Sequence, residues 1–482
     1  MHKKNYNNRS DVIIIGAGSG GLSVGLFLAK VGINVTMIVK SDKDVGGECL
    51  NDGCVPSKAL IHVARQLQAA REAQLYGITL TGDVDIQKAI GYVHAQQEII
   101  RKHENAAWLS EQGITVVLGE ACFEGKHEVN VKGEIYSAKK IVVATGSKPR
   151  KLKVQGIEQV DYLDNENIFH INKLPERLLV VGGGPIGMEI AQAMQRLGSK
   201  VTVIETGDGI LTHDDKALTN ILLKRLQVEG ITFYFNVSLQ KFSSPNDALL
   251  KKENGETFTL SFDAVFVGIG RELILEPLRL EKAGIEVKDH KIIVDDQLRT
   301  TNKDVLVCGD IAGDLQFSHA AELHGRIILN NFFSPLNKKL NNDHMSWVTF
   351  TEPEIATFGL NEKQIKDRGI KYEKLEQDFT GDNRAVTDNY RYARTILYIS
   401  KAGFLKKEKI LGGTMIAPNA GELIQELILA NIVGLSISSI FNKIYPYPVA
   451  TRINQQLIVK HKQKTLTAGL KKLLHVAFKI FN

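Results

Sequence analysis

Two closely spaced cysteines are the residues of this sequence best suited to carry chemistry. Cys49 and Cys54 lie in the stretch GGECLNDGCVPSK, and the 482 residues contain only two other cysteines, Cys122 and Cys308. Pro56 and the helical pattern that follows it predict a helix beginning near Cys54. A cysteine at a helix N-terminus is favoured as the thiolate. The pattern is therefore typical of a redox-active cysteine pair.

A structural zinc site is the main alternative for these thiols. Zinc is usually held by four cysteine or histidine ligands, supplied as closely spaced pairs. The sequence has no second closely spaced cysteine or cysteine–histidine pair. We therefore predict no metal site, and we interpret Cys122 and Cys308 as ordinary buried thiols.

The first of two glycine-rich turns lies just before this cysteine pair. In DVIIIGAGSGG an apolar strand pattern leads into glycines at Gly16, Gly18 and Gly21, and a helical pattern and a second strand pattern follow. The first glycine of such a turn makes the bend, the second lets a pyrophosphate approach the backbone, and the third packs helix on strand. We interpret this segment as a dinucleotide-binding βαβ unit.

The second turn repeats the first one later in the chain. RLLVVGGGPIGMEIAQAMQRLGSKVTVIE places glycines at Gly182, Gly184 and Gly187, and its second strand ends at Glu205. An acid there suits a free ribose 2′-hydroxyl and repels a 2′-phosphate, so the second turn favours NADH over NADPH. The two copies predict two dinucleotides, or one dinucleotide and a degenerate copy.

The first copy lacks the corresponding acid. Val39 occupies the position that Glu205 holds in the second copy. Asp42 or a backbone group would have to replace it, or the ribose would be held in another way.

These motifs lead to a family resemblance. From about residue 10 to about residue 460 the chain is similar to the class I pyridine nucleotide–disulfide oxidoreductases, which include dihydrolipoamide dehydrogenase, glutathione reductase and mercuric reductase. GGECLNDGCVPSK resembles the active-site motif of this family. Four further segments match in the same order along the chain: ATGSKPR at 144–150, VGIGR at 267–271, TNKDVLVCGDIAG at 301–313 and FTEPEIATFG at 350–359.

The resemblance implies roles for individual residues. Lys58 would lie beside a flavin and pair with Glu189, because a desolvated lysine needs a counter-charge. The residues that would bind FAD are Gly16, Gly18, Gly21, Thr145, Gly146 and Asp310. The residues that would bind the nicotinamide dinucleotide are Gly182, Gly184, Gly187, Glu205 and Gly270.

The resemblance also implies a route for electrons. They would pass from NADH through FAD to a Cys49–Cys54 redox disulfide and then to an acceptor that the sequence does not identify. Cys54 would be the thiol on the flavin side, and Cys49 the outer thiol that meets the acceptor. Intact Cys49, Cys54, Lys58 and Glu189 argue against a redox-inactive relative that keeps only the fold.

One family feature is missing near the C-terminus. Dihydrolipoamide dehydrogenase and glutathione reductase use a histidine–glutamate pair from the partner subunit as a base. The matching stretch IYPYPVATRINQQL has Tyr447 in place of the histidine and Arg452 in place of the glutamate. A tyrosine of ordinary pKa is a poor base at neutral pH. The sequence therefore disfavours an efficient lipoamide dehydrogenase, although Tyr447 is retained as a candidate catalytic residue.

Mercuric or other metal-ion reduction and quinone reduction are the alternatives, because metal reduction does not need that base. Mercuric reductases similarly carry a tyrosine in this region. They also use a cysteine pair near the C-terminus, and residues 460–482 contain no cysteine.

The expected architecture is α/β, with two Rossmann-like domains and a C-terminal α+β dimerisation domain. We expect the FAD domain at 1–148 and 272–343, the NAD domain at 149–271, and the dimerisation domain at 344–482. In this family the active site combines two subunits, so a homodimer is expected.

Charge and composition limit the remaining functions. The net charge of +6 is too small to indicate nucleic-acid binding. Few cysteines and no secretory signal favour the cytoplasm. Residues 460–482 carry six lysines, no acid and apolar residues at helical spacing. This tail could make a peripheral contact with an anionic membrane, pack on its own dimer, or be a loose solvated tail.

Overall fold

The computed structural model describes residues 8–160, 162–403, 407–464 and 466–482. By their internal contacts the residues group into two compact units, 1–208 with 229–340 and 209–228 with 341–482. The two largest sheets of the first unit are a mixed sheet with a parallel centre and a parallel sheet, and the second unit contains one antiparallel sheet. This confirms the predicted fold class, whereas the predicted domain bounds remain a prediction.

The first sheet has seven strands in the order β3-β2-β1-β6-β5-β4, with β19 paired to β6. Its centre is parallel because β1 pairs with both β2 and β6 in the same direction. Ile13, Ile14 and Val142 are fully buried in its core. The strands are β1 (Arg9–Ile15), β2 (Val35–Val39), β3 (Thr115–Leu118), β4 (Ala121–Gly125), β5 (Glu128–Val131), β6 (Glu134–Val143) and β19 (Val305–Val307).

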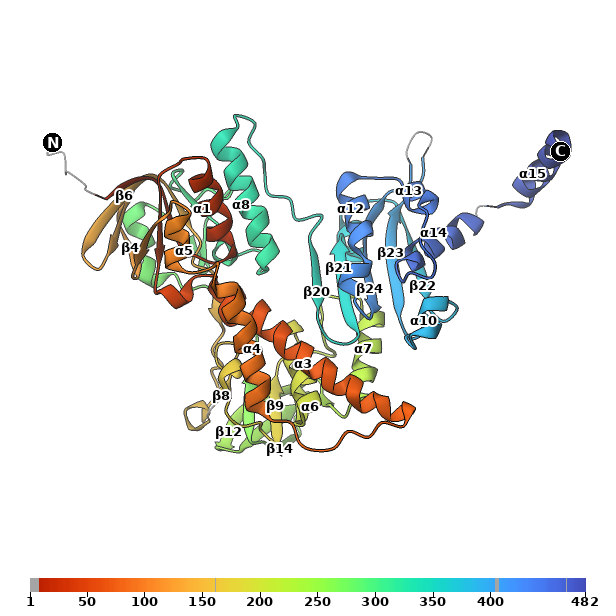
Figure 1. Cartoon of the computed structure of the whole chain (residues 1–482), viewed down its shortest axis with the longest axis horizontal. Coiled ribbons are helices and arrows are strands. Elements are labelled where there is room, and N and C mark those ends of the chain that lie inside the picture. Colours follow the sequence, from red (N-terminus) through yellow and green to blue (C-terminus); the bar gives the residue numbers. More distant parts are fainter. Residues whose placement is uncertain (1–7, 161, 404–406, 465) are drawn as a thin grey trace. The chain divides into compact units, whose positions relative to one another are not determined.

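Helices α1 and α8 lie together beside this sheet, as Figure 1 shows. The helices of this part are α1 (Ser19–Lys30), α2 (Gly47–Asn51), α3 (Cys54–Glu72), α4 (Ile86–Arg101), α5 (Ala106–Glu111) and α8 (Ser318–Phe333). Because α1 follows β1 directly, the Gly16–Gly21 turn stands at the carboxyl end of the central strand. Ligands of open α/β sheets bind at this edge.

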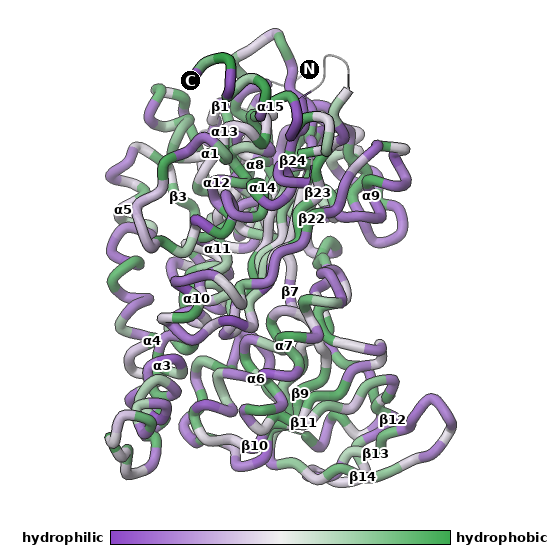
Figure 2. Tube along the Cα trace, turned by 90° about the vertical axis from the view of Figure 1, so that its right-hand side faces the viewer, coloured by the Kyte–Doolittle hydropathy of each residue, from purple (hydrophilic) through white to green (hydrophobic). Residues whose placement is uncertain are grey.

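The second sheet is parallel, in the order β11-β10-β9-β15-β8. Figure 2 shows β9 as mostly hydrophobic, as expected of a central strand that is buried along most of its length. Its elements are β8 (Tyr162–Leu163), β9 (Arg177–Val181), α6 (Pro185–Leu197), β10 (Lys200–Ile204), β11 (Thr232–Tyr234) and β15 (Ala264–Val267). A three-stranded antiparallel sheet accompanies it: β12 (Val237–Ser244), β13 (Asp247–Lys252) and β14 (Thr257–Ser261).

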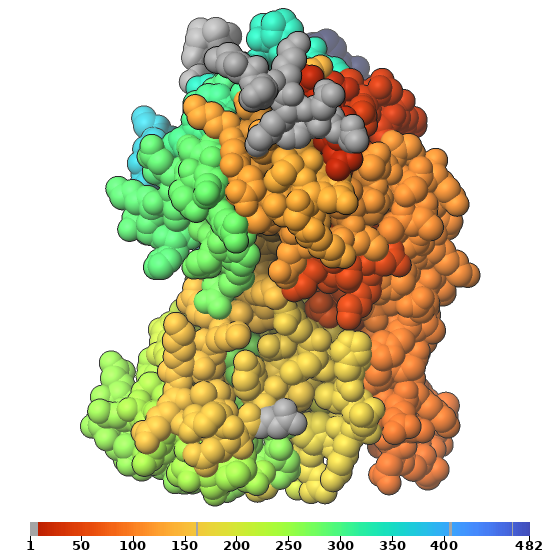
Figure 3. All heavy atoms as spheres, turned by 90° about the vertical axis from the view of Figure 1, so that its left-hand side faces the viewer, coloured from red at the N-terminus to blue at the C-terminus, as the bar shows by residue number. Residues whose placement is uncertain are grey.

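Two elements connect the parallel sheets within the first unit. Strands β7 (Lys148–Pro149) and β16 (Arg271–Glu272) pair where the chain leaves the first sheet and returns to it. Helix α3 packs on α6, so the cysteine motif reaches the second sheet's first helix. In Figure 3 the orange residues of α3 and α4 run beside the yellow residues that follow β7. A short hairpin, β17 (Val287–Lys288) and β18 (Lys291–Ile292), completes this unit.

The second unit is an antiparallel sheet in the order β20-β21-β24-β23-β22. Its strands are β20 (Ser346–Thr349), β21 (Glu354–Gly359), β22 (Tyr372–Asp378), β23 (Arg394–Ser400) and β24 (Ile410–Ala417). Helix α7 comes from between β10 and β11 in the chain, yet it packs on β21 and β24. The helices are α7 (Lys216–Val228), α9 (Glu362–Asp367), α10 (Asn383–Thr387), α11 (Ala420–Leu423), α12 (Gln425–Val433), α13 (Ile437–Asn442), α14 (Arg452–Lys464) and α15 (Ala468–Phe481).

Candidate active site

The two motif cysteines lie on either side of a sharp turn between two helices. Cys49 is within α2, and Cys54 is the first residue of α3 after the N-cap residue Gly53. Both sulfurs are free, so the structure represents the reduced dithiol. The Cys54 side chain is exposed, and its Sγ lies 3.6 Å from the Ser318 hydroxyl at the start of α8. The expected helix N-terminus is therefore present beneath Cys54.

The two thiols differ in acidity. A hydrogen bond with Cys49 is the main reason that the pKa of Cys54 falls to about 6, and the Ser318 hydroxyl and the Lys58 ammonium add to this effect. The same hydrogen bond, together with burial, raises the pKa of Cys49. At neutral pH the reduced pair thus holds one thiolate on Cys54 and one proton on Cys49. Because only a thiolate is nucleophilic, the proton must leave Cys49 before that thiol can attack.

Lys58 and Glu189 meet across the packed helices α3 and α6. The Lys58 Nζ lies 2.8 Å from Glu189 Oε2, and their side chains are 35% and 6% exposed. Glu189 lies one and a half turns into α6, so the contact depends on the packing of α3 on α6. The structure thus brings together two residues that are 131 positions apart in the chain. A cation held in this way stands one helical turn from the Cys54 thiolate.

The first glycine of each fingerprint makes the same close approach. Gly16 and Gly182 have φ of +107° and +111°, in the region that favours glycine. A Cβ on Gly16 would lie 2.3 Å from the Ala144 carbonyl oxygen, and one on Gly182 would lie 2.4 Å from that of Gly268. Any larger residue would therefore push the turn away from the strand beside it.

The helices that follow these turns leave their first N–H groups available to an anion. Gly18 and Gly184 are the N-cap residues of α1 and α6, and neither helix has a side-chain cap or an acid in its first turn. A Cβ on Gly184 would meet nothing within 4 Å, so the approach to that turn is open. Uncapped helix N-termini after glycine-rich turns fit the pyrophosphates of two dinucleotides.

The cysteine motif packs on the first of these glycine-rich turns and is hydrogen-bonded to it. Gly47 has φ of +61°, and a Cβ on it would lie 2.6 Å from the Gly18 Cα. The Gly46 N–H also donates to the Ala17 carbonyl at 2.9 Å. The backbone that carries Cys49 therefore packs directly on the turn expected to hold FAD, so a dinucleotide bound there would lie next to the cysteine motif.

A partly buried ionic network includes the residue that precedes Cys49. The Arg271 guanidinium donates to both carboxylate oxygens of Glu48, and its Nε donates to the Ser147 hydroxyl at 2.7 Å. The Ser147 hydroxyl donates in turn to Asp310 Oδ2 at 2.5 Å. Asn165 also donates to Glu48 Oε1 at 2.7 Å. The residue before Cys49 is thus linked to Asp310, a residue expected to hold FAD.

Burial is the main reason that the pKa of Glu48 rises to about 7, although Arg271 opposes this shift. The sequence reasoning missed Glu48, Ser147 and Arg271. Each lies inside a motif that was recognised, namely GGECLNDGCVPSK, ATGSKPR and VGIGR. The signal that could have identified the pair was the acid Glu48 in one motif and the base Arg271 in another, because the family places both motifs around one flavin.

The predicted acid of the second fingerprint lies against its turn. Glu205 Oε2 accepts from the Gly183 N–H at 2.7 Å, and Oε1 accepts from the Gly207 N–H at 2.8 Å. The segment after β11 lies beside it, because the Val237 N–H donates to the Glu205 carbonyl at 3.2 Å. The carboxylate thus stands at the carboxyl end of the second sheet.

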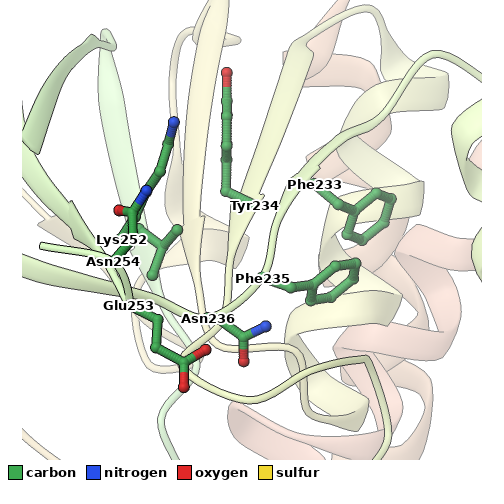
Figure 4. Close-up of a pocket in the computed structure, with 8 residues that line it drawn as sticks. Phe233, Tyr234, Phe235, Asn236, Lys252, Glu253 and Asn254 are labelled. Carbon is green, nitrogen blue, oxygen red and sulfur yellow. The ribbon is translucent and has the colours of Figure 1, made fainter. Parts of the chain in front are cut away.

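A surface pocket of about 530 Å³ opens beside this segment. Figure 4 shows that residues around β11 line one side and that residues at the end of β13 line the other. The pocket does not include the cysteines. Its lining residues are Phe233, Tyr234, Phe235, Asn236, Val237, Lys252, Glu253 and Asn254.

Tyr447 and Arg452 lie in the second unit and do not form a histidine–carboxylate pair. Tyr447 is 64% exposed, its hydroxyl accepts from the Asn383 amide, and the Arg452 guanidinium lies 5.4 Å from its ring centre. The nearby Tyr445 donates to Glu426 at 2.8 Å, and burial with this contact raises its pKa. The hydroxyl of Tyr447 thus meets an amide rather than a carboxylate, and its catalytic role stays a prediction.

The remaining candidate residues lie around the first sheet. Thr145 is exposed and Gly146 has φ of +70° just after β6, while Gly270, with φ of +96°, precedes β16. Cys308 is fully buried, and burial raises its pKa to about 12. Cys122 is half-buried rather than buried. Within the described residues no three histidine, cysteine or acidic side chains are grouped to hold a metal ion.

Two dinucleotide folds around a dithiol, with Cys49 half-buried and Cys54 exposed, define the class of this protein: it is a flavoprotein disulfide oxidoreductase that uses NAD(P)H. The chain belongs to the pyridine nucleotide-disulphide oxidoreductase family, whose model matches residues 10–325. The dimerisation domain of the same family matches residues 345–457 and supports a homodimer.

Similar proteins include several enzymes of this family. A mercuric reductase of Bacillus cereus is 30% identical over 443 residues, which cover 91% of this chain and 69% of that protein. A dihydrolipoyl dehydrogenase of Buchnera aphidicola is 31% identical over 466 residues, covering 93% and 94%. The solved HOCl-induced flavoprotein disulfide reductase RclA of Escherichia coli matches with a TM-score of 0.82 and 25% identity, covering 93% and 99%.

Proposed function

We propose that this enzyme passes electrons from NADH through FAD and the Cys49–Cys54 pair to a soft metal ion. The environment of Tyr447 carries this proposal. Its hydroxyl meets an amide, and a guanidinium lies near its ring, so this position supplies no base for thiol–disulfide exchange. Reduction of a metal ion needs thiolate ligands and electrons, and it needs no proton at the metal.

The residues of the first unit are suited to this task. FAD, when bound, supplies the two-electron transfer between nicotinamide and disulfide. Gly16, Gly18 and Gly21 would cradle its pyrophosphate, with Thr145, Gly146 and Asp310 as further contacts. Cys54 would keep its thiolate on the flavin side, and Cys49 would be the outer thiol. Lys58, paired with Glu189, would hold positive charge beside the ring.

The second fingerprint would bind the nicotinamide dinucleotide. Gly182, Gly184, Gly187 and Gly270 would approach it closely, and Glu205 would accept from the ribose hydroxyls. A carboxylate there repels a 2′-phosphate, which supports a preference for NADH. The enzyme would work in the reducing cytoplasm as a homodimer, and no nucleic acid takes part.

The relatives support a metal-ion acceptor without naming the ion. One group of similar proteins is named mercuric reductase, and RclA has been solved as a Cu(II) complex. The reaction balances for either ion: NADH and Hg²⁺ give NAD⁺, H⁺ and Hg⁰, and NADH with two Cu²⁺ gives NAD⁺, H⁺ and two Cu⁺.

Dihydrolipoyl dehydrogenase activity is the second candidate, because the similarity to a relative of that name extends over 94% of the relative's length. Steady-state NADH oxidation by the FAD-loaded enzyme, with Hg²⁺, Cu²⁺, a quinone and lipoamide as acceptors, separates these functions. We expect turnover with a metal ion that is lost in Cys49→Ser, and little turnover with lipoamide. Fast lipoamide turnover at neutral pH, or metal reduction that survives Cys49→Ser, would show the proposal to be wrong.

A further inference from the structure

The C-terminal helix α15 keeps almost all of its surface exposed. Every residue from Ala468 to Phe481 is exposed except Ala477, which is half-buried. Leu473, Phe478 and Phe481 are 64%, 67% and 82% exposed. Figure 1 shows this helix at the C-terminal end of the chain. Apolar side chains gathered on one helix in this way mark a binding surface.

The polar residues of α15 all lie on one side. At 3.6 residues per turn, they fall within about 100° of the helix circumference, and apolar residues and Ala477 occupy about 200° on the other side. The apolar arc is wider than the stripe of about 100° that a helix usually buries against a globular core. The polar set consists only of Lys471, Lys472, His475 and Lys479.

The positive charge of this region indicates which kind of partner binds the apolar face of α15. Residues 460–482 contain six lysines and no acid, and the whole chain carries a net charge of +6. A second copy of α15 would cover the apolar arc, but it would leave the lysines of both copies without a counter-charge, because residues 460–482 contain no acid. An anionic lipid surface offers negative headgroups to the lysines and an apolar boundary to the leucines and phenylalanines.

We propose that α15 binds in the interface of an anionic lipid bilayer. Its apolar arc would lie at the boundary of headgroups and acyl chains, and the lysine arc would face the headgroup phosphates. The helix is about 21 Å long, which is too short to cross a hydrocarbon core of about 30 Å. Among the described residues, no helix is long and apolar enough to span a membrane.

The N-terminus of α15 is capped by a residue next to it in the sequence. The Thr467 hydroxyl oxygen accepts from the Leu470 N–H at 3.2 Å and caps the helix. The lipid contact therefore requires no change in the dithiol, and it does not depend on which acceptor the enzyme reduces.

Vesicle co-sedimentation of the full-length, FAD-loaded protein tests the proposal. Vesicles of phosphatidylcholine alone are compared with vesicles that also contain phosphatidylglycerol, at low and high salt. We expect binding to the anionic vesicles that weakens at high salt. Lys471→Gln with Lys472→Gln and Lys479→Gln should weaken it by roughly a hundredfold, because each lysine near such a surface contributes about fivefold.

Two further variants separate charge from apolar burial. Phe478→Ser with Phe481→Ser should also abolish binding, because it removes apolar area and keeps the charge. Lys30→Gln with Lys288→Gln and Lys363→Gln removes three exposed lysines from other elements and should leave binding unchanged. All variants should keep the wild-type turnover with a soluble acceptor.

Three results would overturn the proposal. The first is no sedimentation with anionic vesicles, and the second is equal binding by a chain that lacks residues 466–482. The third is a change of this shortened chain from dimer to monomer in light scattering, because α15 would then be an element of the dimer interface.

Discussion

Arg271 donates from both terminal nitrogens to the carboxylate of Glu48, although 223 positions separate the two residues in the chain. Glu48 precedes Cys49 directly, and Arg271 begins β16, where the chain returns to the first sheet. The contact therefore ties the helix that carries Cys49 to the connection between the two parallel sheets. Because the Arg271 side chain is only 10% exposed, we expect its removal to change both the free energy of unfolding and the redox behaviour of the dithiol.

Arg271→Met should lower the free energy of unfolding by about 2 kcal/mol, because it leaves the Glu48 carboxylate, which is 32% exposed, without its guanidinium. Arg279→Met is the matched control, since the Arg279 side chain is 55% exposed and its pair with Glu124 should contribute below about 1 kcal/mol. Denaturant unfolding of both variants measures the difference. Similar losses in the two variants would contradict a special role for Arg271.

The Cys54 thiolate should appear at unusually low pH. In reduced protein with Cys122→Ser, ultraviolet thiolate absorbance should rise with a midpoint near pH 6, and below that pH the thiol is protonated. Cys308 stays protonated in this range because its pKa is about 12. Adding Cys49→Ala removes the main stabilising hydrogen bond, so the midpoint should move upward. A midpoint near pH 9 in the starting protein would contradict the predicted helix-end thiolate.

Gly47→Ala should cost more stability than an alanine at another glycine of positive φ. Its Cβ would meet the Gly18 backbone, so we expect a loss of about 3 kcal/mol together with weaker FAD retention. Gly77→Ala is the control, because Gly77 has φ of +83° and open space around it; it should cost about 1 kcal/mol. Thermal unfolding and the flavin content of the purified variants give the two readouts.

Glu205 should set the choice of nicotinamide dinucleotide. We expect wild-type kcat/KM to be higher with NADH than with NADPH, and Glu205→Ser should reduce this ratio by about tenfold, or about 1.4 kcal/mol. Both dinucleotides are compared at one acceptor concentration. If NADPH were the better substrate of the wild-type enzyme, the role of Glu205 would be wrong.

Tyr447→His combined with Arg452→Glu should restore the missing base pair. General base catalysis typically contributes at least about a hundredfold, so lipoamide turnover should rise by that order. Metal-ion turnover should stay unchanged, because that reaction does not use the base. The single variants serve as controls, since a histidine without its glutamate should recover less.

Local patterns allowed the two strand–turn–helix units and the helix N-terminus at Cys54 to be predicted from the sequence, and the family resemblance added the dimerisation domain that completes the fold class. Glycine spacing and apolar periodicity act over a few neighbouring residues, so they can be found without knowing the fold. The motif resemblance added the Lys58–Glu189 pair, which no local pattern could have joined.

Only the tertiary structure joined Glu48 to Arg271 and Gly47 to Gly18. Each contact depends on how sheets and connecting strands bring distant segments together, and the sequence around each residue contains no record of its partner. The same holds for α7, which lies between β10 and β11 in the sequence but packs on β21 and β24 of the second unit. Local sequence thus determined which elements form and which residues can react, whereas packing decided which charges and backbones meet around the dithiol.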